Sequence, residues 1–153
     1  MNQDSRRSQL TPKLVDSLYV EAMVLADEAR SYFDVQAEAD RGTLEPLARV
    51  GFACESLRVT TRLMHIIAWL LTQRAVAAGE ISGAEAQTPE RRLGEAPPSD
   101  RALADAFPET ARALIQASQD LYERVARLDR ISGEPQSEFS PARTLMSRLE
   151  RSL

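Results

Sequence analysis

Few residues in this 153-residue sequence could support catalysis. The chain has one cysteine, Cys54, and one histidine, His65. A nucleophile and its base must lie within hydrogen-bonding distance, but eleven residues of one helix would separate these two by about 16 Å along the axis. We therefore expect Cys54 to be a small core residue and His65 to be an ordinary helix-bundle residue, and we predict no catalytic residues.

Metal and nucleotide sites also lack their usual sequence patterns. A structural zinc site needs four Cys or His ligands, and a dinuclear site in a helical bundle needs Glu-x-x-His on two helices. Gly79, Gly83 and Gly94 are isolated and match no nucleotide-binding loop. The sequence therefore predicts a protein that is not an enzyme and has no metal and no cofactor.

The composition favours helix. Ala, Leu, Arg and Glu make up 72 residues, and 43% of the chain is apolar, which is enough for one sizeable core. The formal net charge is −4, and 18 of the 19 basic residues are arginine. Because there is no lysine-rich tract, we do not expect nucleic-acid binding.

Two segments superficially resemble targeting signals. Arg6-Arg7 resembles a twin-arginine export signal, but Lys13, Asp16 and Glu21 interrupt the apolar stretch that such a signal needs. The longest apolar run, residues 63–71, is about half of a membrane span. We therefore predict a cytoplasmic protein without a membrane segment, in which a lone reduced cysteine is ordinary.

Apolar spacing predicts three long helices. The first begins after Thr11, a plausible N-cap, and ends at Gly42. The second runs from about Pro46 to Gly79, and the third from Pro108 to Ser132. The predicted buried faces are Leu14, Leu18, Ala22, Leu25, Ala29 and Tyr32 in the first; Leu47, Val50, Cys54, Leu57, Thr61, Met64, Ala68, Leu71 and Ala75 in the second; and Ala111, Leu114, Ile115, Ser118, Leu121, Tyr122, Val125 and Leu128 in the third.

These helices predict an all-α antiparallel three-helix bundle over residues 11–131, with a flexible N-terminus at 1–10. Residues 80–99 read as a long connection that is either mobile or functional, and Ser99 could cap a short turn over 100–107. Residues 132–153 read as a flexible tail that ends in a short amphipathic helix from Pro141.

The second helix is apolar nearly all round between residues 63 and 71. Two neighbouring helices cannot cover such a cylinder, so a second subunit, the long connection or a partner protein should cover the rest. Among these we favour a homodimer built on this helix. The candidate interface residues are Leu63, Ile66, Ile67, Trp69 and Leu70.

Arginines cluster on two of the predicted helices. Arg58 and Arg62 lie near Glu55, while Arg124, Arg127 and Arg130 alternate with Glu123 and Asp129. One interpretation is a solvated face with weak intrahelical pairs; the other is a docking surface, because arginine is enriched at protein interfaces. The candidate partner-binding residues are Arg58, Arg62, Arg124, Arg127, Leu145, Met146 and Leu149.

The second helix also carries a recognisable motif. Residues 55–64, ESLRVTTRLM, and 68–76, AWLLTQRAV, followed by Gly79-Glu80, closely resemble the signature of the regulator of CtrA degradation (RcdA) family. Residues 121–129, LYERVARLD, look like that family's third helix. The resemblance covers roughly residues 14–131 and excludes the N-terminal ten residues and the tail.

The resemblance implies a non-enzymatic adaptor that helps the ClpXP protease degrade cell-cycle regulators such as CtrA. Implied partners are a CpdR-like receiver-domain protein that primes ClpX and a PopA-like cyclic-di-GMP effector, with recruitment to the cell pole. The sequence leaves two other functions open. One is a helical scaffold without a proteolytic role, and the other is a small-molecule sensor with its ligand near Trp69 and His65.

Overall fold

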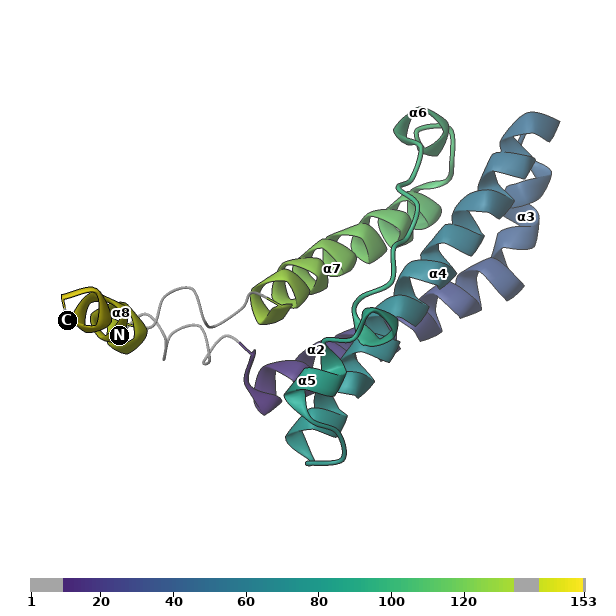
Figure 1. Ribbon diagram of the computed structural model, residues 1–153. Coiled ribbons are helices and arrows are strands. Elements are labelled where there is room, and N and C mark those ends of the chain that lie inside the picture. The colour runs from purple at the N-terminus through teal and green to yellow at the C-terminus, as the bar shows by residue number, and fades with distance from the viewer. Residues whose placement is uncertain (1–9, 134–140, 153) are drawn as a thin grey trace.

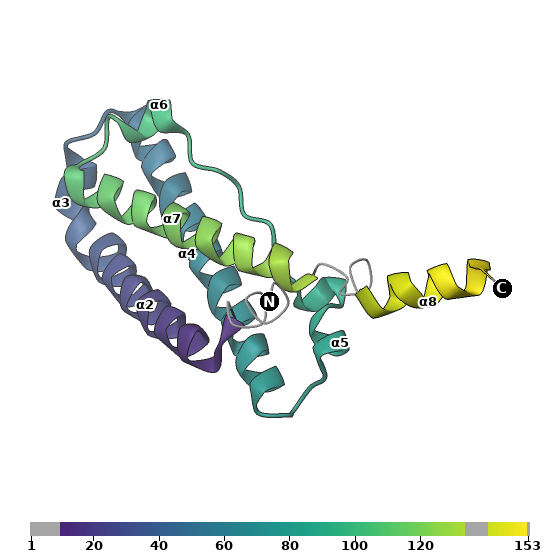
Figure 2. The same ribbon diagram turned by 90° about the vertical axis from the view of Figure 1, so that its left-hand side faces the viewer.

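The computed structural model describes residues 10–133 and 141–152, and within these ranges every regular element is helical. Three long helices pack together: α2 (Pro12–Ser31), α4 (Pro46–Ala77) and α7 (Glu109–Gly133). Figures 1 and 2 show these helices side by side, with the short helices near their ends. The predicted all-α fold of three packed helices is confirmed.

The direction of the third helix differs from the prediction. Phe33, just after α2, contacts Phe52 near the start of α4, whereas Asp16 near the start of α2 pairs with Arg74 near the end of α4, so α2 and α4 are antiparallel. Along α4 and α7, however, Arg62 contacts Ser118 and Trp69 contacts Asp129, so these two helices run the same way. The long connection between them makes this possible, because it carries the chain back along the bundle before α7 begins (Figure 1).

The first helical rod is interrupted by a π-helical turn. Thr11 caps α2 as predicted, accepting a hydrogen bond from the Leu14 amide at 3.1 Å, and Pro12 occupies the first turn. The rod continues through η2 (Tyr32–Gln36), the π-helical turn, into α3 (Ala37–Gly42). The helix therefore ends at the predicted glycine, but its π-helical turn was not foreseen.

The core lies between the three long helices and has an aromatic cluster at one end. Phe52 of α4 meets Phe33 at a ring-centroid distance of 5.5 Å and Phe107 at 5.4 Å, in edge-to-face geometry. The predicted α7 face is largely buried, and Tyr122 and Leu128 are partly buried against the core. The α2 face is likewise buried, apart from a partly exposed Leu14.

The long connection is ordered and partly helical. It forms α5 (Gly83–Ala86) and η3 (Pro89–Arg91), and then an extended segment over residues 92–100, which we call the strap. Both ribbon views show the strap running beside α4 and α7 (Figures 1 and 2). It leads into α6 (Arg101–Ala104), whose N-cap is Asp100. Ser99, predicted as the cap, instead binds α4.

The predicted C-terminal helix is present as α8 (Pro141–Ser152). Both ribbon views place it apart from the three long helices (Figures 1 and 2). The expected flexible N-terminus and the first part of the predicted tail fall mostly on residues 1–9 and 134–140, which lie outside the described residues. Across the described part of the chain, no helix is long and apolar enough to cross a membrane.

Candidate functional site

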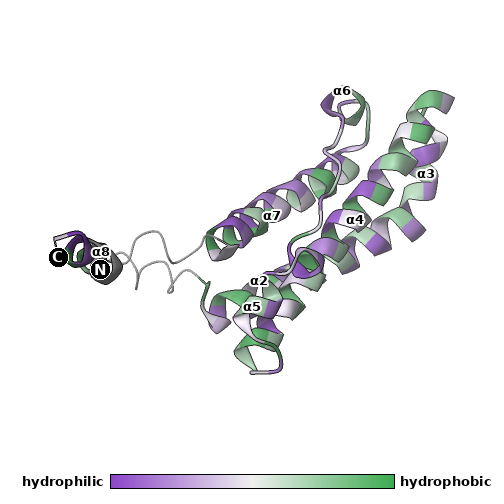
Figure 3. Cartoon of the chain, viewed as in Figure 1, coloured by the Kyte–Doolittle hydropathy of each residue, from purple (hydrophilic) through white to green (hydrophobic). Residues whose placement is uncertain are grey.

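One face of α4 is apolar and open to solvent. Leu47, Leu57 and Met64 are 78%, 68% and 65% exposed. Figure 3 shows apolar residues at intervals along α4. We call this surface the open face; it consists of Leu47, Val50, Cys54, Leu57, Thr61, Met64, Ala68, Leu71 and Ala75, of which Thr61 and Ala75 are partly buried. These are the residues predicted to form the buried face of this helix, so that prediction was wrong.

The opposite side of α4 forms the core and includes two buried charged residues. Glu55 is fully buried and Arg62 is 2% exposed, and Gln73 is buried about three turns further along the helix. This buried face also includes Phe52, Val59, Leu63, Ile66, Trp69 and Leu70. Leu63, Ile66, Trp69 and Leu70, expected at a subunit interface, therefore contact the rest of their own chain, and Ile67 is partly buried against the same core. These residues are therefore not free to form the subunit interface that the sequence predicted.

Arg62 links α4 to both α7 and the strap. Its guanidinium donates to the Ser118 hydroxyl at 3.2 Å, to the Pro97 carbonyl at 3.0 Å and to the Ser99 hydroxyl at 2.6 Å. Ser99 in turn donates to Glu55. Burial lowers the pKa of Arg62, while the Glu55 carboxylate favours its charged form. Arg62 is therefore a structural residue inside the bundle, although the sequence suggested a partner-binding role.

A second polar contact fixes the other end of the strap. The Asp129 carboxylate accepts hydrogen bonds from the Trp69 indole and from Arg92, both at 2.9 Å. Tyr122 donates to the Gly94 carbonyl at 2.6 Å, and burial is the main cause that raises its pKa. A Cβ at Gly94 would lie 1.8 Å from His65 Nδ1, so any larger residue here would force the strap or the ring to shift.

The other predicted arginines differ in their surroundings. Arg58 is partly exposed and pairs with Glu55 on its own helix. Arg124 is exposed and holds Glu21 of α2 through two hydrogen bonds, which raise its pKa. Arg127 is exposed on α7, where the structure gives it no ion pair. These three stay accessible to a partner.

The predicted apolar residues of the tail share one helix. Leu145, Met146 and Leu149 are all exposed on α8 at helical spacing. Leu149 follows Leu145 by four residues and Met146 by three, so all three lie on the same side of that helix. The structure thus brings them together, but it does not join them to the arginines of α4 and α7.

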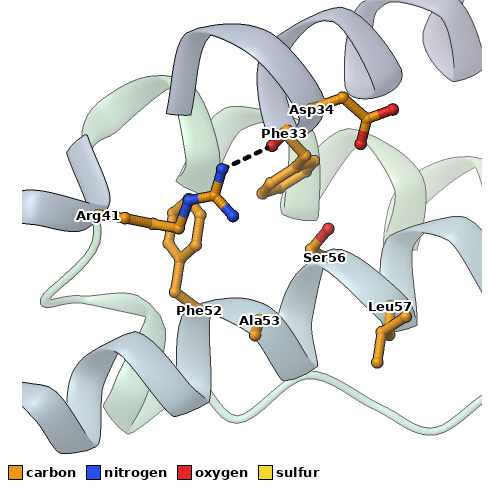
Figure 4. A pocket seen from close by; sticks show the side chains of 7 residues that line it. All are labelled: Phe33, Asp34, Arg41, Phe52, Ala53, Ser56 and Leu57. Carbon is orange, nitrogen blue, oxygen red and sulfur yellow. Dashed lines mark hydrogen bonds between the residues drawn. The ribbon is translucent and has the colours of Figure 1, made fainter. Parts of the chain in front are cut away.

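A shallow pocket lies where the π-helical turn passes the first half of α4. Its volume is about 280 Å³, and it is lined by Phe33, Asp34, Arg41, Phe52, Ala53, Ser56 and Leu57 (Figure 4). No sequence pattern predicts this pocket, because its residues come together only where the π-helical turn packs against α4. In the described part of the chain, no group of His, Cys, Asp and Glu side chains is arranged to hold a metal ion.

The chain is similar to known proteins in both sequence and structure. The family model described as "Protein of unknown function (DUF1465)" matches residues 6–153. Among solved structures, RcdA from Caulobacter crescentus CB15 is similar at 38% sequence identity and a TM-score of 0.62, with 76% of this chain and 88% of that chain covered. A search of the curated proteins finds no match. These matches indicate no catalytic family, and the chain belongs to the DUF1465 family and to the family of RcdA.

Proposed function

We propose that this protein is a non-enzymatic, cytoplasmic adaptor that helps to deliver cell-cycle regulators such as CtrA to the ClpXP protease. The kinship with RcdA supports this role. The proposed partners are ClpXP, a CpdR-like receiver-domain protein, a PopA-like cyclic-di-GMP effector and the delivered regulators. Recruitment to the cell pole belongs to the same proposal.

The open face of α4 is the observation that carries this proposal. An adaptor acts by raising the local concentration of a substrate at the protease, so it needs binding surfaces rather than a catalytic centre. Large contiguous apolar surfaces on a folded protein commonly mark protein interaction sites. Here the open face extends along most of α4 while Glu55 and Arg62 are buried on the other side.

A homodimer is part of the same proposal, with its interface on the open face. The residues of this face recur at alternating spacings of three and four from Leu47 to Ala75. Such a repeat is the pattern with which two helices pack side by side. The exposed Leu57 and Met64 thus replace the buried Leu63 and Leu70 as proposed interface residues.

A reconstituted degradation assay tests the adaptor role. ClpXP, the receiver-domain protein, the effector and purified CtrA are combined with and without this chain, and loss of CtrA is followed over time. We expect faster loss with the wild-type chain and little acceleration with Leu57→Asp/Met64→Asp. The matched control is Ala113→Asp, which places a carboxylate on the exposed side of α7. A rate that does not depend on the chain would contradict the proposal.

The two alternative functions receive less support. A ligand near Trp69 and His65 would have to compete with existing contacts, because Asp129 already binds the Trp69 indole and Gly94 lies against His65. A scaffold without a proteolytic role would explain a chain that binds CtrA in the same assay yet leaves its degradation rate unchanged.

A further inference from the structure

The pocket beside the π-helical turn has the features of a peptide-binding site. We infer that this π-turn pocket binds a segment of a partner protein in which an apolar side chain lies next to a carboxylate. The inference rests on the proposed adaptor role, which requires a partner segment, and it gives that segment a definite chemistry. Figure 4 shows the pocket and its lining residues.

The floor of the π-turn pocket is aromatic and held firmly in place. Phe33 and Phe52 are 6% and 1% exposed, and their rings meet edge to face. Phe52 is held from its other side by Phe107. Leu57 lines the pocket but is largely exposed, and Ala53 contributes only a methyl group. An apolar side chain of a partner would therefore enter a preformed site at a small ordering cost.

Three polar side chains around this floor are available to a ligand. Arg41 donates to the Phe33 carbonyl at 3.3 Å, yet among the described residues no carboxylate lies within ion-pair distance of its guanidinium. Neither the Ser56 hydroxyl nor the Asp34 carboxylate has a hydrogen-bond partner within the same ranges. In Figure 4 the Asp34 carboxylate points away from Arg41. A partner carboxylate can thus pair with Arg41, while peptide N–H groups can meet Asp34.

The π-helical turn brings these groups together. It lies between two α-helical segments, where Tyr32 and Phe33 are consecutive buried residues and Asp34 is exposed. The Tyr32 hydroxyl donates to Asp40 at 2.6 Å, which ties the turn to α3. Burial and the Asp40 carboxylate both raise the pKa of Tyr32, so its hydroxyl remains a donor at neutral pH. Single π-helical turns within α-helices often occur at functional sites.

The shape of the pocket favours a protein segment over a free metabolite. Small-molecule sites usually bury most of their ligand, whereas this one is shallow and has the exposed Leu57 in its lining. Leu57 also belongs to the open face, so the pocket is continuous with that apolar surface. Because a second copy of the chain occupies the open face in the proposed dimer, the partner segment would reach the pocket from the side of the π-helical turn, next to the dimer interface.

Titration of the full chain, followed by amide NMR, tests this inference. The probes are the pentapeptide acetyl-Ala-Leu-Leu-Asp-Ala-amide and its Asn counterpart. We expect the Asp peptide to shift the amide signals of Arg41, Ala53 and Ser56. Loss of the charged pair should weaken binding about tenfold, either in the Asn peptide or in the Arg41→Gln variant.

Ala53→Leu should fill the pocket and abolish the shifts, whereas Ala113→Leu makes the same change on the exposed side of α7 and should bind normally. Equal binding of the two peptides, unchanged binding by Ala53→Leu, or equally tight binding of free leucine would overturn the inference. The titration contains no protease, so its failure is distinct from failure of the adaptor role. A degradation rate independent of the chain would defeat only the latter.

Discussion

The two faces of α4 differ from those of a typical helix in a soluble protein, which buries apolar residues and exposes polar ones. The buried face places Glu55, Arg62 and Gln73 among its apolar residues, whereas the open face is built mainly from Leu, Val, Met and Ala. Both faces repeat every seven residues: Phe52, Val59, Ile66 and Gln73 on one, and Leu47, Cys54, Thr61 and Ala68 on the other. Both faces of α4 therefore have the spacing with which a helix packs against a neighbouring helix.

The difference between the faces follows from what covers them. The strap and α7 provide hydrogen-bond partners for Arg62, and the strap does so for Glu55, which removes much of the cost of burying charge. Nothing in the described part of the chain covers Leu57 or Met64 to a similar degree. The buried face is therefore complete within one chain, and the open face is the side on which a partner would gain most apolar burial.

One substitution placed on both faces should give the largest contrast. Leu70→Asp buries a carboxylate without a partner and should cost at least about 4 kcal/mol, enough to give insoluble or unfolded protein. Met64→Asp, on the open face, should change the free energy of unfolding of the monomer, measured at protein concentrations below those at which the proposed dimer forms, by no more than about 0.5 kcal/mol. Urea unfolding and the soluble fraction measure both effects. Equal destabilisation by the two variants would show that the faces are wrongly assigned.

Removal of the buried cation should have the next largest effect. Arg62→Ala removes one of the two cations near the buried Glu55, leaving Arg58 as the other, and it leaves Ser118 and Ser99 with fewer partners. We therefore expect a loss of about 3 kcal/mol. Urea unfolding gives the value, and Arg127→Ala is the matched exposed control. A loss below about 1 kcal/mol would mean that the strap contributes little to the stability of the buried face.

A methyl group at Gly94 tests how closely the strap is held. Gly94→Ala would bring its Cβ against His65, so the strap or the ring must shift, and we expect a cost of about 1–3 kcal/mol. Gly83→Ala is the control, since nothing lies within 4 Å of its added Cβ. Thermal unfolding of the two variants should differ clearly, and matching melting temperatures would argue against close packing of the strap.

The smallest effect is expected at the surface. Arg124 and Glu21 join α7 to α2 at 2.7 Å, but both side chains are about half exposed, and such pairs contribute little. Arg124→Ala should cost about 0.5 kcal/mol or less, and the cost should fall as salt is added. A large, salt-independent loss in urea unfolding would mean that this pair is more than a surface contact.

The sequence was sufficient for much of the fold but not for the orientation of α4. The Thr11 cap, the end of the first rod at Gly42 and the buried face of α7 could be read from it, because local rules decide them. The buried face of α4 could not be predicted in this way. The regular spacing of apolar residues favours the open face instead, and the hydrogen-bond partners of Arg62 lie 35 to 56 residues away in the sequence. The π-turn pocket was missed for a similar reason, since its residues meet only after α2 and α4 have packed.

The most direct test of the account is the mass of the protein in solution, measured by sedimentation equilibrium. We predict that the wild-type chain is a dimer and that Leu57→Asp/Met64→Asp is a folded monomer that still unfolds cooperatively, at a lower melting temperature because it has lost the stabilisation that dimerisation provides. Ala113→Asp should remain a dimer. A wild-type monomer, or a variant that keeps the dimer mass, would contradict the claim that the open face of α4 is the site of association.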